Sequence, residues 1–192
     1  MNKWTSRDFI TLAIFTIVIL ITYMFSTILT PFVGQMIAVA ITGFLITPFM
    51  FVMVSKINKI GVFFLTAILL GLFFAITGLI HYIFIYVAFS FIAELIVWKR
   101  YQSLSRLTFA TIVFHLSYIS GGIIPLFLFR ERYLAIVETM YTKKGDLESM
   151  LYYYGTPSMA TIMLIAAAIG VIVGSVLGRR LLQQHVKKAK LA

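Results

Sequence analysis

The chain has 192 residues, of which 61% are hydrophobic and 11% are charged, and its formal net charge is +10. A soluble domain of this size needs far more polar surface to cover its core, so the composition excludes a water-soluble globular protein and predicts one surrounded mainly by lipid. The absence of cysteine excludes disulfides, thiolate metal sites and cysteine nucleophiles. The basic residues gather at the ends of apolar runs, which indicates membrane orientation rather than nucleic-acid binding.

Apolar runs of about 20 residues, the length that crosses a bilayer core as a helix, recur along the chain. The first run is too long for a signal peptide, and no small-residue cleavage site follows it. The stretch from Ile60 to Trp98 has no basic residue and is long enough for two spans, with a turn expected at 78–82. The six predicted spans are residues 9–29, 32–54, 60–79, 82–98, 107–129 and 158–177, and the longest loop is 130–157.

The positive charges are distributed unequally between the two sides of these spans. Twelve of the sixteen Lys and Arg residues lie near the N-terminus, in the turns around Lys56 and Arg100, or in the C-terminal tail. Cytoplasmic loops are enriched in Lys and Arg, so both termini are predicted to be cytoplasmic and the 130–157 loop external. The fold class predicted is an all-α membrane protein, a single six-transmembrane-helix bundle, N-in/C-in, in the bacterial cytoplasmic membrane.

Aromatic and basic side chains gather at the predicted outer end of the bundle. Gly121, Gly122 and Pro125 within the fifth span predict a local break in the helix, which is tolerated at membrane depth where backbone is buried or lines a cavity. An interfacial aromatic belt with headgroup anchors explains the same residues without a ligand, so a pocket and a belt remain alternatives. The candidate substrate-binding residues are His81, Tyr82, Tyr86, Tyr118, Arg130, Arg132 and Tyr133.

Small residues recur along one face of two predicted spans. Gly170, Gly174 and Gly178 are four residues apart in the last span, and Ala67 and Gly71 form a shorter series in the third. Small residues allow another helix to approach closely. That helix belongs either to the same bundle or to a partner subunit, and the sequence leaves both alternatives open.

Glu94 is the one acidic residue inside a predicted span, about one turn before Lys99. An intramembrane carboxylate is a functional candidate by default, but near the helix end we favour snorkelling or pairing with the neighbouring basic residues over a proton relay. The chain has no phosphate-binding loop, no zinc-protease motif and no nucleophile elbow. His115, Ser117 and Ser120 share one helix and have no separate base. We therefore expect no enzyme, no catalytic residue, no metal site and no cofactor.

Several segments carry a family resemblance, which covers the whole chain. They are residues 7–16, 47–50, 125–134 and 174–189, of which the glycine-rich C-terminal helix with its basic tail and the Arg130-x-x-Tyr133 pattern are the more specific. In these segments the chain resembles the Trep-Strep, or MptD-type, integral membrane family, whose members are taken to be substrate-binding S components of energy-coupling factor (ECF) transporters. The resemblance implies an ECF S-component-like bundle that binds a vitamin or other micronutrient outside the cell.

The resemblance also implies partners, namely a transmembrane coupling protein and two cytoplasmic ATPases. S components often carry Ala-x-x-x-Ala in the first helix for docking, whereas here Ala13 is followed by Ile17 and only the first small residue is kept. The candidate partner-interface residues are Ala13, Ala67, Gly71, Gly170, Gly174 and Gly178. The alternative function is a stand-alone membrane transporter or small-molecule-binding membrane protein without ATPase partners.

Overall fold

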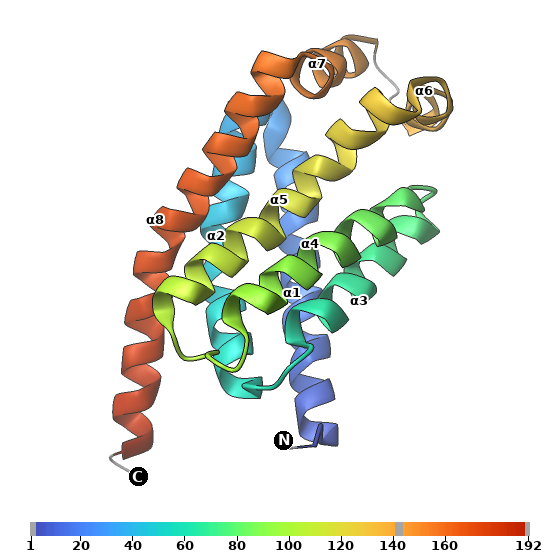
Figure 1. The fold of residues 1–192 in the computed structure, drawn as a ribbon. Coiled ribbons are helices and arrows are strands. Elements are labelled where there is room, and N and C mark those ends of the chain that lie inside the picture. Colours follow the sequence, from blue (N-terminus) through green and yellow to red (C-terminus); the bar gives the residue numbers. More distant parts are fainter. Residues whose placement is uncertain (1–2, 141–143, 191–192) are drawn as a thin grey trace.

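A computed structural model describes the backbone of residues 3–140 and 144–190 (Figure 1). The described residues form eight α-helices and contain no strand. The helices are α1 (Ser6–Val33), α2 (Gln35–Ile57), α3 (Val62–Ile76), α4 (His81–Val97), α5 (Leu104–Leu128), α6 (Arg130–Met140), α7 (Lys144–Gly155) and α8 (Pro157–Lys190). By length and composition α1, α2, α5 and α8 can each cross a membrane, whereas α3 and α4 are shorter apolar helices of 15 and 17 residues.

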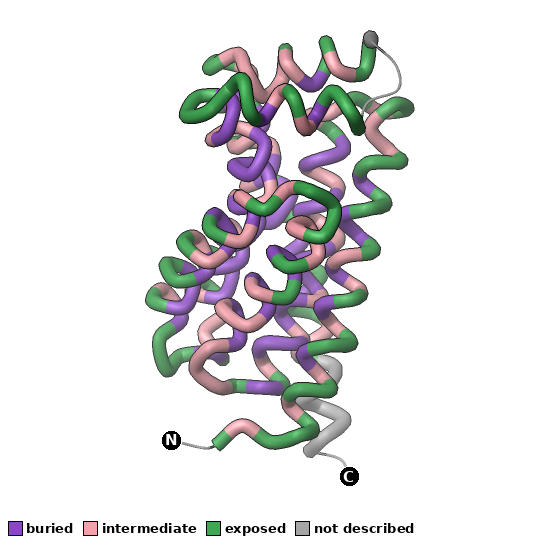
Figure 2. Tube along the Cα trace, turned by 90° about the vertical axis from the view of Figure 1, so that its right-hand side faces the viewer, coloured by how far each residue is buried: buried purple, intermediate pink, exposed green. Residues whose placement is uncertain are grey.

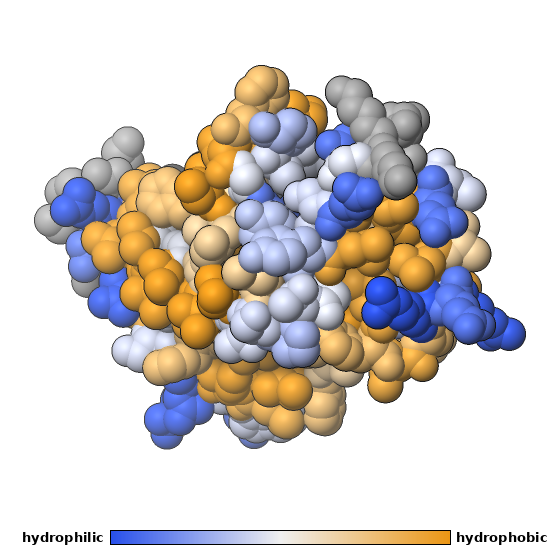
Figure 3. Space-filling view, turned by 90° about the horizontal axis from the view of Figure 1, so that it is seen from above, coloured by the Kyte–Doolittle hydropathy of each residue, from blue (hydrophilic) through white to orange (hydrophobic). Residues whose placement is uncertain are grey.

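The two ends of the bundle differ in composition. The N-terminus, the α2–α3 turn, the α4–α5 turn and the C-terminal half of α8 lie at one end (Figure 1), which we call the basic end because these segments contain the twelve clustered Lys and Arg residues. The opposite end, called here the α6–α7 end, contains the α1–α2 turn and the two short helices. Viewed from above, this face has residues of intermediate hydropathy near its centre, with hydrophobic residues and separate groups of hydrophilic ones around them (Figure 3).

Three sequence predictions about helix boundaries are wrong. The α1 helix continues through Pro31, and the turn lies at Gly34, whose φ of 82° favours glycine. The α5 helix is unbroken through Gly121, Gly122 and Pro125. The stretch 130–157, expected as a loop, instead forms α6 and α7, which lie across the end of the bundle (Figure 2). Residues 141–143 of that stretch lie outside the described part of the chain.

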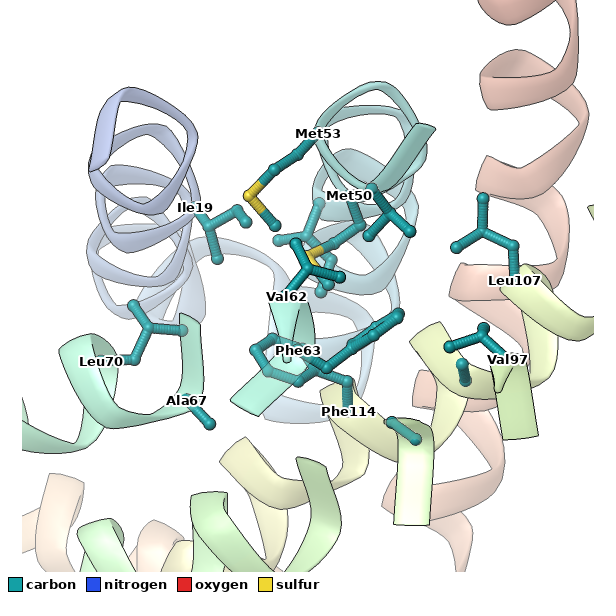
Figure 4. Packing of buried hydrophobic residues seen from close by; sticks show 14 of the residues in the cluster. Ile19, Met50, Met53, Val62, Phe63, Ala67, Leu70, Val97, Leu107 and Phe114 are labelled. Carbon is teal, nitrogen blue, oxygen red and sulfur yellow. The ribbon is translucent and has the colours of Figure 1, made fainter. Parts of the chain in front are cut away.

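The core is formed mainly by the inner faces of α1 to α5. Figure 4 shows Ile19, Met50, Phe63 and Phe114, from four different helices, meeting in one cluster of fully buried side chains. The outward faces are equally apolar but exposed, as at Phe84 and on α1. Exposed apolar surface over the length of the bundle is what lipid contact requires.

Five of the six candidate partner-interface residues lie inside this bundle. A Cβ atom on Gly170 or Gly174 would overlap the backbone of α2, and one on Gly178 would lie 2.8 Å from the ring of Phe51. In the same way a Cβ on Gly71 would lie 2.8 Å from the Cα of Ile83 in α4. Ala67 is also fully buried. Packing within the chain therefore accounts for these small residues.

Ala13 differs from the other five candidates. It is exposed on the outer face of α1. Its exposed neighbours on this helix include Ile14 and Ile17. Of the six candidates, Ala13 is thus the position that a partner can reach without rearrangement of the bundle.

Candidate functional site: a cavity at the α6–α7 end

A cavity of about 660 Å³ lies at the α6–α7 end, between the ends of the long helices and the two short helices above them. Its volume is within the range of small-molecule sites, roughly 300–1,000 Å³. The lining residues are Thr27, Thr30, Pro31, Gly34, Gln35, Phe74, Leu79, Tyr82, Tyr118, Gly122, Tyr133, Val137, Met140, Asp146, Ser149, Met150, Tyr153 and Tyr154. Seven of the eight helices contribute to this list, so the cavity depends on the fold of the whole chain.

Stacked aromatic rings form the inner wall of the cavity. Tyr118 of α5 stacks on Tyr23 of α1, with ring centroids 4.2 Å apart. Phe74 of α3 stacks on Tyr82 of α4 at 4.7 Å. Tyr86 lies behind them, fully buried, with its ring 6.0 Å from that of Tyr82. Because each ring is held by a neighbour from another helix, the wall is rigid and presents aromatic surface to the cavity.

His81 has a structural role beside the cavity that follows from Pro125. Proline has no backbone N–H, so the Gly121 carbonyl four residues earlier has no helical donor. The Nε2 atom of His81 lies 3.1 Å from that carbonyl oxygen and donates to it in the matching tautomer. The imidazole also contacts the ring of Tyr133 edge-on, with centroids 5.3 Å apart. His81 thereby joins α4 to α5 and supports a cavity-lining tyrosine, although it does not line the cavity itself.

The Gly121-Gly122 pair provides room for two tyrosine rings. A Cβ atom on Gly121 would overlap the ring of Tyr82, and one on Gly122 would lie 2.6 Å from Cδ1 of Tyr154. Both tyrosines line the cavity. The glycines that suggested a helix break in the sequence therefore allow α4 and α7 to pack their aromatic side chains against the backbone of α5.

The short helices are fastened over the cavity by specific contacts. The Gln35 amide at the start of α2 donates to the Tyr154 hydroxyl of α7 at 2.8 Å. Leu126, Tyr133, Val137 and Met150 form a small buried cluster that joins α5, α6 and α7. These contacts make α6 and α7 a cover for the cavity rather than a solvated connection.

The structure brings together Tyr82, Tyr118 and Tyr133 of the candidate site and separates the rest. His81 and Tyr86 lie behind the wall, and Arg130 and Arg132 are exposed and do not line the cavity. Sequence reasoning did not include Gln35 or Tyr154. Two signals pointed to them, because Gln35 is a polar residue at the start of an apolar run and Tyr154 ends a run of three tyrosines.

Glu94 lies at the basic end and has partners different from those expected. Its carboxylate accepts hydrogen bonds from the backbone N–H groups of Gly61 and Phe63, at 2.8 and 3.1 Å, and from the Tyr101 hydroxyl. The prediction that it pairs with neighbouring basic residues is wrong, and the ion pair found among the described residues joins Lys59 to Asp8. Glu94 thus caps the N-terminus of α3. Burial and the hydrogen bond to Glu94 raise the pKa of Tyr101, which lies in the α4–α5 turn.

The all-helical fold and the apolar outer faces define the class of this protein as a helical membrane protein. Residues 6–188 match the family described as a hypothetical bacterial integral membrane protein (Trep_Strep), and the chain belongs to this family. Comparison with curated proteins found no match, and neither did comparison with solved structures.

Proposed function

We propose that this chain is the substrate-binding S component of an ATP-driven, ECF-type importer of a vitamin or other micronutrient. The observation that carries the proposal is the 660 Å³ cavity, which is lined by aromatic and hydroxyl side chains and lies at the end opposite the clustered basic residues. The chain has no phosphate-binding loop, so the energy for import comes from partner ATPases. The family resemblance of the segments described above supports the same role.

The proposal includes a topology of six spans with both termini in the cytoplasm. The shorter apolar helices α3 and α4 are then the third and fourth spans. The basic end faces the cytoplasm, because Lys and Arg are retained on that side of the membrane. The α6–α7 end faces outside, where a scarce nutrient has to be captured.

Cysteine labelling tests this orientation, because the natural chain has no cysteine and needs no prior removal of one. Gly145 is exposed on α7 with nothing within 4 Å of an added Cβ, and Ser105 is exposed at the basic end. In intact cells a membrane-impermeant maleimide is expected to label Gly145→Cys and not Ser105→Cys, and permeabilised cells should show both labelled. Labelling of Ser105→Cys alone in intact cells would show that the orientation is opposite to the one proposed.

Assembly with the ATPases tests the importer role. The chain should co-purify with a transmembrane coupling protein and two ATPases, and uptake into proteoliposomes should require all of them and ATP. Replacing the exposed Ala13 with Leu should lower co-purification severalfold without changing the melting temperature of the isolated chain, because the larger side chain blocks close helix contact. Ala135→Leu, exposed on α6 at the opposite end, is the matched control.

Two outcomes of this experiment contradict the proposal. Uptake by the chain reconstituted alone would identify a stand-alone transporter, the alternative considered from the sequence. Equal loss of co-purification in the Ala13→Leu and Ala135→Leu variants would show that docking does not use the outer face of α1.

A further inference from the structure

We infer that the cavity binds a flat, nitrogen-containing ring compound that carries no net negative charge. The inference rests on the proposed function only in taking the cavity as a substrate site. By residue type alone, the histidine, tyrosines and arginines of the candidate site favour a flat or an anionic molecule, and the cavity distinguishes these alternatives.

The charges around the cavity argue against an anion. Among its described lining residues there is no Lys, Arg or His, and Asp146 is the one charged side chain. Arg130 and Arg132 are exposed and outside the lining. The described lining residues offer a carboxylate or phosphate no cationic partner to offset the loss of its hydration, which makes its binding to them unfavourable.

The shape and chemistry of the wall argue for a ring. The rings of Phe74, Tyr82 and Tyr118 are fixed by stacking, and Tyr153 and Tyr154 of α7 also line the cavity. Fixed aromatic faces favour a flat ligand, which stacks on them with little loss of entropy. The side-chain amide of Gln35 both donates and accepts hydrogen bonds, as the edges of nitrogen heterocycles require.

Asp146 extends the inference to positively charged rings. Its carboxylate lies in the first turn of α7 at the cavity lining, within a wall rich in tyrosine. Aromatic faces attract cations, and a carboxylate adds to that attraction. We therefore expect a cationic ring to bind through Asp146 as well as through stacking, and a neutral ring to bind through stacking and hydrogen bonds alone.

Binding of two ligand pairs to the purified chain in lipid nanodiscs tests this inference. Thiamine is compared with thiamine diphosphate, and riboflavin with flavin mononucleotide, so that each pair shares its rings and differs by phosphate. At least one unphosphorylated compound should bind, and its phosphorylated form should bind at least about tenfold more weakly. Equal or tighter binding of a phosphorylated form overturns the inference, and so does the absence of binding by all four compounds.

Variants distinguish the cavity from binding elsewhere. Gly121→Ala displaces the ring of Tyr82 and should weaken every observed binding at least about fivefold. Asp146 is exposed and asparagine is nearly isosteric with it, so the Asp146→Asn variant should fold normally. This variant should bind thiamine more weakly and riboflavin as tightly as the natural chain does. Glu148→Gln, exposed on α7 and outside the lining, is the control. If the Gly121→Ala and Asp146→Asn variants both bind the test compounds as tightly as the natural chain does, those compounds bind outside this cavity and the inference fails.

The two proposals fail in different ways. If a neutral or cationic ring binds but no ATPases co-purify, the proposed substrate class is supported and the importer role is contradicted. If ATPases co-purify but a phosphorylated compound binds more tightly, the importer role is supported and the proposed substrate class is contradicted.

Discussion

Replacing Glu94 with Ala should lower the stability of the bundle by about 3 kcal/mol or more, because hydrogen bonds to a charged group contribute roughly 1.5–3 kcal/mol each and three donors lose their acceptor together. Two of the donors are backbone N–H groups at the start of α3, which have no partner within their own helix. The third is the hydroxyl of Tyr101, which is itself buried. The melting temperature in detergent should fall by roughly 6 °C or more.

Two further variants show whether Glu94 acts as a cap. Glu94→Gln keeps one acceptor oxygen and should lose about half as much stability, whereas Glu148→Ala on the exposed face of α7 should change little. An unchanged melting temperature in Glu94→Ala would disprove the capping role. A Glu94→Gln variant that folds normally and has lost all transport would instead restore the proton relay that we set aside.

Replacing Gly170 with Val should lower the stability by about 3 kcal/mol or more, because overpacking typically costs about 1–3 kcal/mol and the obstacle here is backbone that cannot move aside. The added Cβ would overlap the carbonyl oxygen of Ala40 in α2. One turn further along, Pro48 leaves the Phe44 carbonyl without a helical N–H donor, and the backbone of Gly174 covers that oxygen. Valine on α8 would hold the two helices apart along this seam.

The measurement is the melting temperature of the isolated chain, with Val173→Leu as control. Val173 is 53% exposed on the lipid-facing side of the same helix, so the added methylene meets lipid instead of backbone. A Gly170→Val chain that melts normally yet fails to co-purify with the proposed coupling protein and ATPases would return Gly170 to the candidate partner-interface residues. A lower melting temperature confirms packing within the chain.

The parts of the fold that follow from hydropathy could be predicted from the sequence. Every predicted span overlaps an apolar helix, because lipid-facing and buried positions are both apolar and the run lengths remain visible. The ends of these helices could not be predicted, because a proline in the sequence usually indicates that a helix breaks or ends there. In the fold, Pro125 remains helical because the carbonyl it deprives of a donor is satisfied by His81, from another helix.

Part of the candidate site lines one cavity. Tyrosines gather at the predicted outer end of the chain, and three of those selected line the cavity at the α6–α7 end. Arg130 was selected because it directly follows an apolar run, where its planar cation can bind an anionic group, and Arg132 lies two residues further on. Helix α6 instead leaves them exposed, and the sequence gives no sign of this because 130–157 is polar enough to look like a loop. The two backbone partners of Glu94 were equally hidden, since they lie 31 and 33 residues away.

In the proposed six-span topology α3 and α4 cross the membrane, and their shortness then affects the surrounding bilayer. A helix of 15 residues is about 22 Å long, which is less than the roughly 30 Å of a hydrocarbon core. The α3–α4 turn therefore lies below the level reached by α1 and α8, although Ile76 and Ile80 beside it are apolar and exposed (Figure 1). A thinner lipid layer on this flank relieves the hydrophobic mismatch. In that topology the bilayer around the protein is uneven, and a deformation confined to one flank favours a tilt toward that side.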